Sequence, residues 1–331
     1  MDCKRPYKYS ALRQLLSLIC ILAMMSCTWV KDEYDCPSGF WLKLNYTYNI
    51  LDVEAASKYV KDAYVYVYDT DGNYVKRVYS SYSDLMANDM RVRIDELPEG
   101  EYRFVVWCGI DDRFAIGGEN KAIDDFRLTL LTSAGNSYEG QLPELLYGYL
   151  PDIYYDDSYV IHDVDLMKNT NLFSCLIVSI DNQAVMDPND YEMKIISANG
   201  TMNAYNQLVS GIDITYVPNK QISVVFNDTE YGDLQGIQYS IPCLRLMDEK
   251  RDRIVLEKKE SHQKLFDISL SDYFGKVGKL YMATGRELTV QNYLDRQDFY
   301  TIVFYLSDDL ERLITLKVNN WRVRADNHVK L

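Results

Sequence analysis

Adjacent pairs of aspartates are the residues of this sequence best suited by type to general acid–base chemistry. They occur as Asp111-Asp112, Asp124-Asp125 and Asp156-Asp157. Cleavage of a glycosidic bond needs two carboxyl groups held roughly 5–9 Å apart across the sugar, and adjacency in the sequence does not provide this. Because the chain contains 49 acidic residues, such pairs are expected by chance and are typical of solvated loops. We therefore predict no catalytic residues among them. A lipid-anchored hydrolase that uses paired acids stays an alternative, which carboxyl groups converging on one point of a cleft would favour and scattered acids would exclude.

Residues 69–73, Asp-Thr-Asp-Gly-Asn, place oxygen-bearing side chains at alternate positions, as a calcium-binding loop does. Such a loop has glycine at its sixth position and glutamate at its twelfth, whereas here Gly72 is fourth and Ser80 is twelfth. An Asp-Gly step between two alternating runs is also a strong hairpin signal, and a hairpin turn is what we expect. The chain has three histidines, which lie far apart in the sequence: His162, His262 and His328. The sequence thus predicts no metal site and no cofactor.

The first 26 residues differ from everything that follows them. Basic side chains, among them Lys4 and Arg13, precede an apolar run over residues 15–25. Eleven residues of helix reach about 16 Å, roughly half of a bilayer core, so a stable membrane span is not expected. This order of basic and apolar segments is typical of a secretory signal peptide, which we place at residues 1–26.

Ser26-Cys27 ends this segment and resembles the bacterial lipoprotein box. In that motif the signal peptide is cut between these two residues, and the thiol of Cys27 receives a diacylglyceride. Several acyl chains, palmitate among them, would hold the N-terminus firmly, because each buried methylene adds about 0.8 kcal/mol. Met24 stands where the motif usually has leucine. The alternative is a conventional signal peptide followed by an ordinary cysteine.

Residues 27–39 form the predicted lipidated tether, which is acidic. A charged run of this kind is usually a solvated linker. It also resembles the signal of a lysine followed by acids that directs some lipoproteins of Bacteroidales-type bacteria to the outer cell face. In this chain Lys31 is followed by Asp32 and Glu33.

Composition places the rest of the chain among ordinary folded proteins, with 47% hydrophobic and 25% charged residues. A net charge of −14 counts against nucleic acid as a partner, because phosphate binding needs clustered basic residues. The length of 331 residues suggests two domains. Tyrosine is unusually frequent, with 29 copies against 10 phenylalanines, and it favours strands with one half-wet face.

Alternating hydrophobic residues predict short strands throughout the chain. Before residue 110 they fall at 41–48, 63–68, 74–79, 90–94 and 101–107, with brief helical turns at 57–61 and 83–87. Residues 110–157 are rich in loop-forming and acidic residues. A polar joint at 168–171 precedes a second set of strands, which runs from residue 173 to 318. We predict an all-β fold of two tandem antiparallel β-sandwich domains, at residues 40–167 and 168–331.

Four cysteines lie beyond the lipobox: Cys36, Cys108, Cys175 and Cys243. No two of them have metal-ligand spacing. Outside the cytoplasm they allow three disulfide pairings. One bridge per domain would join Cys36 to Cys108 and Cys175 to Cys243, while buried free thiols are the alternative.

Tyrosines of the middle region could stack on sugar rings if they were exposed together. The candidates are Tyr147, Tyr149, Tyr154 and Tyr155. The structural alternative is that they cover sheet faces and edges. The abundance of tyrosine and the tandem sandwiches keep open an alternative function, a surface glycan-binding lipoprotein of a carbohydrate-uptake system.

Four passages together resemble the FimB-type fimbrial anchor-subunit family of Bacteroidales. They are the lipobox cysteine with an acidic tether ending in Asp-Cys-Pro at 35–37, the strand–turn run at 64–72, the Tyr-Leu-Asp-Arg passage at 291–300, and Leu-Lys-Val-Asn-Asn-Trp at 316–321. The resemblance covers essentially the whole chain after the signal peptide. It implies two transthyretin-like β-sandwich domains and no enzymatic activity.

The resemblance also implies a location and partners. Members are lipid-anchored in the outer membrane, exposed at the cell surface, and sit at the base of a fimbrium that they tie to the cell. Their partner is a fimbrial shaft subunit, joined by β-strand complementation, and they can limit the length of the polymer. Adhesion to host or bacterial surface ligands stays open. We consider residues 313–331 a candidate donor or edge strand, with an ordinary final strand as the alternative.

Overall fold

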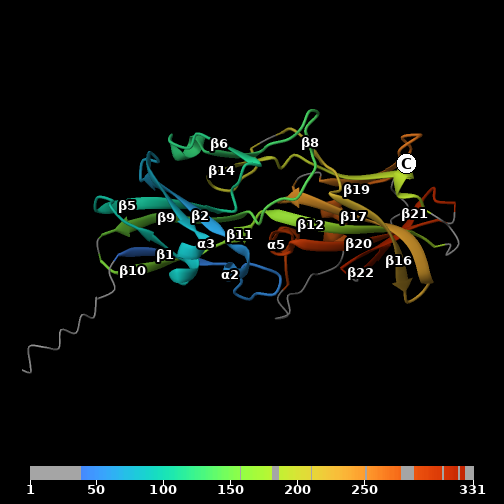
Figure 1. The fold of residues 1–331 in the computed structure, drawn as a ribbon, viewed down its shortest axis with the longest axis horizontal. Coiled ribbons are helices and arrows are strands. Elements are labelled where there is room, and N and C mark those ends of the chain that lie inside the picture. The colour runs from blue at the N-terminus through green and yellow to red at the C-terminus, as the bar shows by residue number, and fades with distance from the viewer. Residues whose placement is uncertain are drawn as a thin grey trace, which may run out of the picture. The chain divides into compact units, whose positions relative to one another are not determined.

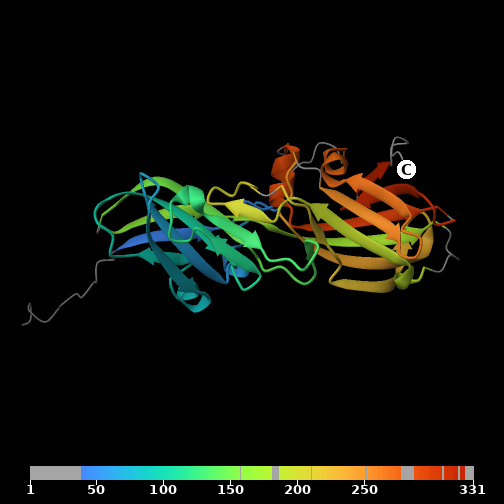
Figure 2. The ribbon, with the colours of Figure 1, turned by 90° about the horizontal axis from the view of Figure 1, so that it is seen from above.

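Strands dominate the computed structural model and confirm the predicted all-β class (Figures 1 and 2). The structure describes residues 39–156, 158–180, 186–209, 211–249, 252–276, 287–307, 309–319 and 321–324. The predicted signal peptide, Ser26, Cys27 and nearly all of the tether, including Cys36, lie outside the described residues.

Two sheets pack face to face in the first half of the described chain. One has the order β10-β1-β4 and the other β11-β9-β5-β2-β3. Alternating side chains such as Phe40 and Leu42 of one sheet, and Val65 and Val67 of the other, share one buried cluster. The strands of these sheets are β1 (Phe40–Asn45), β2 (Asp62–Asp69), β3 (Tyr74–Ser81), β4 (Arg91–Ile94), β5 (Gly100–Cys108), β9 (Leu146–Tyr155), β10 (Val160–Asp165) and β11 (Met167–Lys168).

A small third sheet, β14-β7-β6, covers the other face of this five-stranded sheet. It consists of β6 (Phe114–Gly117), β7 (Arg127–Leu130) and β14 (Thr201–Asn203). Its cover explains the alternation in β2, where Val65 and Val67 face the first core and Tyr66 and Tyr68 are buried on the opposite side. Tyr66 packs edge-on against Phe126, with ring centres 5.0 Å apart. Tyrosine therefore serves here as a buried residue between two layers.

Two larger sheets form the second half. Their orders are β16-β17-β12-β20-β21-β22 and β19-β18-β13-β15-β8. The six-stranded sheet contains β12 (Thr170–Ser179), β16 (Lys220–Asp228), β17 (Gly232–Leu244), β20 (Phe299–Leu306), β21 (Leu313–Val318) and β22 (Trp321–Arg324). The facing sheet contains β8 (Ser137–Tyr138), β13 (Tyr191–Ser197), β15 (Ile214–Tyr216), β18 (Arg253–Lys258) and β19 (Lys264–Ser269).

Short helices connect the strands. The predicted helical turns are confirmed as α2 (Ala56–Tyr59) and α3 (Tyr82–Ala87), and Ser81 and Asp84 form a capping box at the start of α3. Between β19 and β20 lie α4 (Leu270–Lys276) and α5 (Val290–Arg296). Single 3₁₀ turns occur at Ile123–Asp125 and Pro188–Asp190.

Pairing among the described strands is mainly antiparallel, but three pairs run parallel: β1 with β10, β12 with β20, and β15 with β8. Strands also cross the expected boundary near residue 168. β8 pairs with β15 of the second half, and β14 of the second half pairs with β7 of the first. Each half therefore completes a sheet of the other. The domain limits at 40–167 and 168–331 stay a prediction.

β9 was not anticipated, because Gly148 and Pro151 interrupt its hydrophobic run and both disfavour a strand. The fold requires glycine at this point. A Cβ atom at Gly148 would lie 2.5 Å from Cγ1 of Val164 and 2.9 Å from Cδ2 of Leu166. β10 and the residues after it therefore cross β9 too closely to admit a side chain.

Candidate functional site

The two margins of the six-stranded sheet are the candidate assembly surface. In the described part of the chain, β22 pairs only with β21 and β16 pairs only with β17. A marginal strand presents unpaired N–H and C=O groups, to which another chain can add a strand. Figure 1 shows both strands in the C-terminal half.

The C-terminal margin contains the segment singled out in the sequence. β21 is an inner strand of the sheet, and its side chains Leu316 and Val318 are buried. β22 follows after a short turn, pairs with β21 from Val318–Trp321 to Thr315–Arg324, and is marginal. The candidate segment thus combines an ordinary sandwich strand, β21, with an edge strand, β22.

Stacked aromatic side chains stabilise the inner strands next to this margin. Phe173 of β12 and Tyr300 of β20 stack with ring centres 4.6 Å apart and planes 10° apart. Phe266 and Phe304 stack in the same way, with centres 4.5 Å apart. Such pairs add roughly 0.5–1.5 kcal/mol each beyond their buried area. These rings therefore stabilise the parallel pair β12–β20, beside which β21 and β22 are paired in order.

A buried carboxylate fastens the opposite margin to the centre of the sheet. Asp228, at the end of β16, accepts hydrogen bonds from Tyr305 Oη at 2.6 Å and Lys317 Nζ at 2.6 Å. Burial alone would raise the pKa of Asp228, but these bonds and the N–H groups of Glu230 and Tyr231 hold that pKa well below its usual value. Burial and the bond to Asp228 raise the pKa of Tyr305 to about 12. The network ties the β16–β17 turn to β20 and β21.

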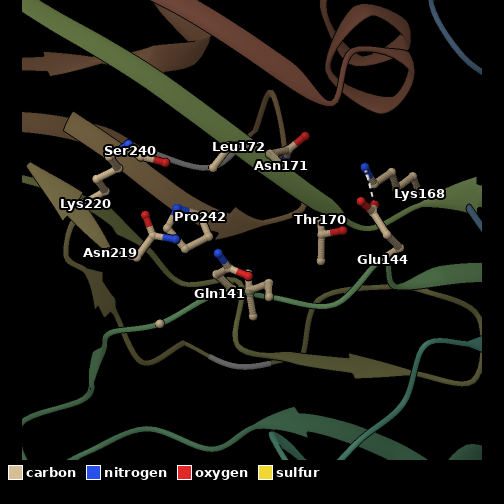
Figure 3. A pocket seen from close by; sticks show the side chains of 12 residues that line it. Gln141, Glu144, Lys168, Thr170, Asn171, Leu172, Asn219, Lys220, Ser240 and Pro242 are labelled. Carbon is tan, nitrogen blue, oxygen red and sulfur yellow. Dashed lines mark ion pairs between the residues drawn. The ribbon is translucent and has the colours of Figure 1, made fainter. Parts of the chain in front are cut away.

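A cavity of about 600 Å³ lies where the loop before β9 meets the starts of β12 and β16 (Figure 3). Amide and hydroxyl side chains line much of it, and the Glu144–Lys168 ion pair lies at one end. The Oδ1 atom of Asn219 is buried there without a hydrogen-bond partner. The cavity has the size of a small-ligand site, and its lining suits hydrogen bonding more than acid–base chemistry.

Lys168 joins three parts of the chain beside this cavity. Its Nζ lies 2.5 Å from Glu144 Oε2 and 2.8 Å from Asp298 Oδ2. The same ammonium group lies over the ring of Tyr59 in α2, 4.8 Å from its centre. Burial alone would lower the pKa of Lys168, but the two carboxylates outweigh this effect and raise it. The polar joint seen in the sequence therefore begins with a nearly buried lysine that pairs with two partly exposed carboxylates.

The Tyr-Leu-Asp-Arg passage forms α5, whose C-terminal end contacts both halves. Asp295 accepts two hydrogen bonds from the guanidinium of Arg245, at 2.8 and 3.1 Å. Arg296 lies 3.4 Å from Asp52 Oδ1, and its guanidinium lies over the ring of Tyr48, 4.0 Å from the centre. This passage of the family resemblance therefore joins the two halves of the fold.

The acidic residues that the sequence offered as catalytic candidates form ion pairs or hydrogen bonds with other residues of the fold. Asp111 pairs with Arg113 at 2.6 Å, and Asp156 accepts a bond from the Ser158 N–H at 3.0 Å. Asp124 accepts one from Tyr205 Oη at 3.4 Å. Asp157 lies outside the described residues. In the described ranges, no group of three or more His, Cys, Asp or Glu side chains is placed to hold a metal ion.

The Asp-Gly run is a hairpin turn, as predicted. Asp69 Oδ1 accepts a hydrogen bond from the Asn73 N–H at 2.8 Å, and β2 and β3 pair on either side of the turn. His162 lies in β10 with its ring 4.8 Å from that of Phe40. Burial lowers the pKa of this histidine. His162 is thus part of the sheet packing.

The expected pairing of Cys175 with Cys243 does not occur in this structure, in which both are free and buried. β12 and β17 are in register so that Cys175 lies opposite Tyr239, and Cys243 is four residues further along. At about 3.4 Å per residue this separates their Cα atoms by far more than the roughly 7 Å limit for a disulfide. Cys108 is also a free, buried thiol, and its expected partner Cys36 lies outside the described residues.

The four candidate tyrosines do not form one platform. Tyr147 and Tyr155 are buried, and Tyr147 Oη donates to the carbonyl of Ala204 at 2.9 Å. Tyr149 packs edge-on against Tyr205. Tyr154 is the exposed one of the four, at 56%. Three of the four therefore cover sheet faces.

Sequence reasoning missed the β16 margin, the Asp228 network and the Lys168 cluster. The first had a signal in the uncharged apolar run Ile-Ser-Val-Val-Phe at 222–226. The other two join residues between 24 and 130 positions apart, and no local pattern marks them. No helix in the described ranges is long and apolar enough to cross a membrane.

Comparison with solved structures gives the same fold in proteins of Bacteroides and Porphyromonas species. A candidate adhesin of Bacteroides thetaiotaomicron is 27% identical with a TM-score of 0.76, over 88% of this chain and 99% of its own. A candidate polysaccharide-binding protein of the same species is 26% identical with a TM-score of 0.74, over the same shares. The fimbrial anchor protein Mfa2 from Porphyromonas gingivalis shares the fold at 17% identity and a TM-score of 0.68, over 88% and 100%.

No curated protein matches the sequence. A family model does match: that of the fimbrillin-A associated anchor proteins Mfa1 and Mfa2, over residues 32–327. This match confirms the fimbrial anchor family expected from the sequence. Because it covers nearly all of the 331 residues, the chain belongs to the family of Mfa2-type fimbrial anchor proteins.

Proposed function

We propose that this protein is an outer-membrane lipoprotein, exposed at the cell surface, that anchors a fimbrium at its base and ends its assembly. The family match over residues 32–327 is the observation that carries the proposal. The N-terminal segment supports lipid attachment at Cys27, because a basic and apolar leader ends at Ser26-Cys27. The tether then places the folded part outside the membrane.

Assembly would use strand complementation with a shaft subunit. The marginal strand β22 supports this, because its outer side has no strand partner in the described part of the chain. Backbone hydrogen bonds along such a margin give affinity, and alternate side chains give register. An N-terminus held by lipid cannot be released as a strand, so a polymer that reaches this subunit ends there.

Substitution of Cys27 by alanine tests the anchor. Without acyl chains the N-terminus loses the transfer free energy of its methylenes, about 0.8 kcal/mol each. We expect the variant protein to leave the outer-membrane fraction and fimbriae to appear in the medium, as seen by fractionation and electron microscopy. Cys36→Ala, nine residues away, is the matched control and should leave fimbriae on the cells. Retention of Cys27→Ala in the membrane with normal fimbriae would show that lipid at Cys27 is not the anchor.

Deletion of residues 322–331 tests the C-terminal margin. It removes all of β22 after Trp321 and so removes the strand to which a shaft subunit would add. We expect surface display of the anchor to continue while attachment of fimbriae is lost, measured by immunogold labelling and fimbrial yield. Thermal unfolding of the shortened chain is the control for folding. Normal attachment by a folded, shortened chain would show that residues 322–331 do not act as the donor strand.

Glycan binding is the second candidate function. The cavity lined by amides and hydroxyls favours it, as does the likeness to a candidate polysaccharide-binding protein at 26% identity. The dispersal of the candidate tyrosines counts against it, because sugar rings are held on clustered exposed aromatics. Binding assays with soluble polysaccharides follow if the Cys27 experiment reveals no fimbriae on the unmodified cells.

A further inference from the structure

β16 is a long marginal strand, and within the described chain neither a bulge nor a charged residue lies between its two ends. Its register with β17 is regular from Lys220–Ser240 to Asp228–Gly232, without a bulge. Its inner residues, Gln-Ile-Ser-Val-Val-Phe at 221–226, include no charge and no proline. Ile222 is 37% and Val225 71% exposed. Natural proteins shield such edges, so an exposed and regular apolar edge indicates a pairing surface.

Two other marginal strands of the described chain are shielded. β3 pairs with β2 through a bulge at Val67/Tyr68, and it carries Lys76 and Arg77. β19 pairs with β18 through a bulge after Leu256, and its Lys264 carries a charge. Bulges and charges are two of the devices that prevent edge-to-edge association. β16 has neither between its two ends.

We propose that β16 pairs antiparallel with β16 of a second copy of this chain, about a two-fold axis at Val224. This register places Ile222 opposite Phe226 of the second copy, and Val224 opposite its own equivalent. β-branched and aromatic residues facing one another across strands contribute roughly 0.2–1 kcal/mol per pair. The strand is therefore complementary to itself, and the proposal is independent of the lipid anchor and the shaft subunit.

The face of the sheet next to β16 fits this pairing. Val224 and Phe226 pack beside a small buried cluster on the outer face of the six-stranded sheet. Ile222 and Phe299 line a shallow hollow of about 210 Å³ on the same face. A second copy would extend the cluster across the axis with its own Ile222, Val224 and Phe226.

Charge at the two ends of β16 is also complementary. Lys220 begins the strand and is exposed, while Glu230 lies in the turn after it and is exposed. Antiparallel pairing brings the beginning of one strand beside the end of the other. Lys220 of each copy then approaches the turn that contains Glu230 of the other. Asp228 takes no part, because Lys317 and Tyr305 already bind it.

Two-fold pairing closes on itself. An isologous contact uses the same strand in both copies and yields a dimer, whereas a head-to-tail contact yields a filament. The pairing would leave β22, at the opposite margin of the sheet, free for a shaft subunit. Two anchors could then be joined at the base without blocking the proposed assembly surface.

Cysteine cross-linking of the full chain in isolated outer membranes tests the register. Two Val224→Cys residues would face each other with Cα atoms about 4.5–5.5 Å apart, within the range of a disulfide. Val225→Cys is the matched control, because Val225 is more exposed but its two copies would lie about 8 Å apart. We expect mild oxidation to give about tenfold more disulfide-linked dimer with Val224→Cys than with Val225→Cys.

A charge swap gives a second measurement. Misfolding of a single variant cannot explain it, because a second substitution is expected to restore the dimer that the first one reduces. In the Val224→Cys chain, Lys220→Glu should reduce the dimer band on a non-reducing gel, and adding Glu230→Lys should restore it. The unmodified chain, oxidised in parallel, accounts for its natural thiols. Restoration by the second charge would support the pairing directly.

Three results would overturn the proposal. Absence of a Val224→Cys dimer from a chain with normal thermal unfolding would exclude pairing at this register. Equal cross-linking of Val224→Cys and Val225→Cys would show random collision. A Val224→Cys adduct with a different protein would assign β16 to a heterologous strand.

Discussion

Replacement of Asp295 by alanine is expected to lower the free energy of unfolding by about 3–5 kcal/mol, the usual cost of breaking a buried ion pair from one side. The carboxylate is 7% exposed and its partner Arg245 is 11% exposed. Its two bonds to Arg245 are joined by a third from Gln291 Nε2 at 2.8 Å. Alanine would leave the guanidinium buried without a counter-charge, although Arg245 Nη1 would keep its bond to the Asn206 carbonyl.

Urea unfolding of the variant and of the unmodified chain measures this difference. The matched control is Asp95→Ala, which breaks a pair with Arg93 in which both side chains are about half exposed, 49% and 48%. Exposed pairs contribute about 0–1 kcal/mol, so this control should unfold almost as the unmodified chain does. Similar losses of unfolding free energy in the two variants would mean that burial of the Arg245–Asp295 pair does not determine its contribution to stability.

Asp295 also bears on function through the position of α5. The next residue, Arg296, contacts Asp52 and donates to the carbonyl of Asn49 at 3.2 Å. The backbone N–H of Ile50 in turn donates to the carbonyl of Arg296 at 3.0 Å. A displaced α5 would loosen this contact with the segment after β1. We expect the Asp295→Ala protein to be depleted at the cell surface in proportion to its loss of stability.

Replacement of Gly109 by alanine is expected to cost about 2–5 kcal/mol, from two separate causes. Gly109 has φ +80°, in the left-handed region, where a Cβ atom costs about 1–2 kcal/mol. That Cβ would also lie 2.3 Å from the backbone oxygen of Glu144. Relief of the overlap must shift a backbone that holds Glu144 against Lys168, and overpacking of this kind costs about 1–3 kcal/mol.

Gly135→Ala separates the two causes. Gly135 has φ +81°, and nothing lies within 4 Å of the position that its Cβ would take. This control therefore has the conformational cost alone, about 1–2 kcal/mol. The difference between the two variants in thermal or urea unfolding measures the overlap at Glu144. Equal losses would show that the backbone around Glu144 yields without cost.

Local patterns predicted most of the individual strands. The Tyr-Val-Tyr-Val-Tyr run gave β2, and the Asp-Gly step gave its hairpin with β3, because both signals lie within a few residues. The same reasoning missed β9, where Gly148 and Pro151 are poor strand residues but Gly148 is required by the crossing of β10. Local propensity and long-range packing disagree at that site, and packing prevailed.

The proposed disulfide between Cys175 and Cys243 shows the same limit. Equal division of cysteines between two domains favoured the pair, but the register of β12 with β17 places Tyr239 opposite Cys175. Register depends on the whole hydrophobic face of a strand, and a shift of a single residue would reverse every side chain. A count of cysteines contains no information about register.

The sequence by itself determined the all-β class, the hairpins and the family, because composition, turn residues and contiguous motifs specify these properties locally. Only the tertiary structure decided which strands are marginal and which residues join the halves. The margins β16 and β22, and the contacts of Lys168 with Glu144 and Asp298, result from strand order. Strand order arises from pairing between segments far apart in the chain, where burial of whole faces outweighs local preference.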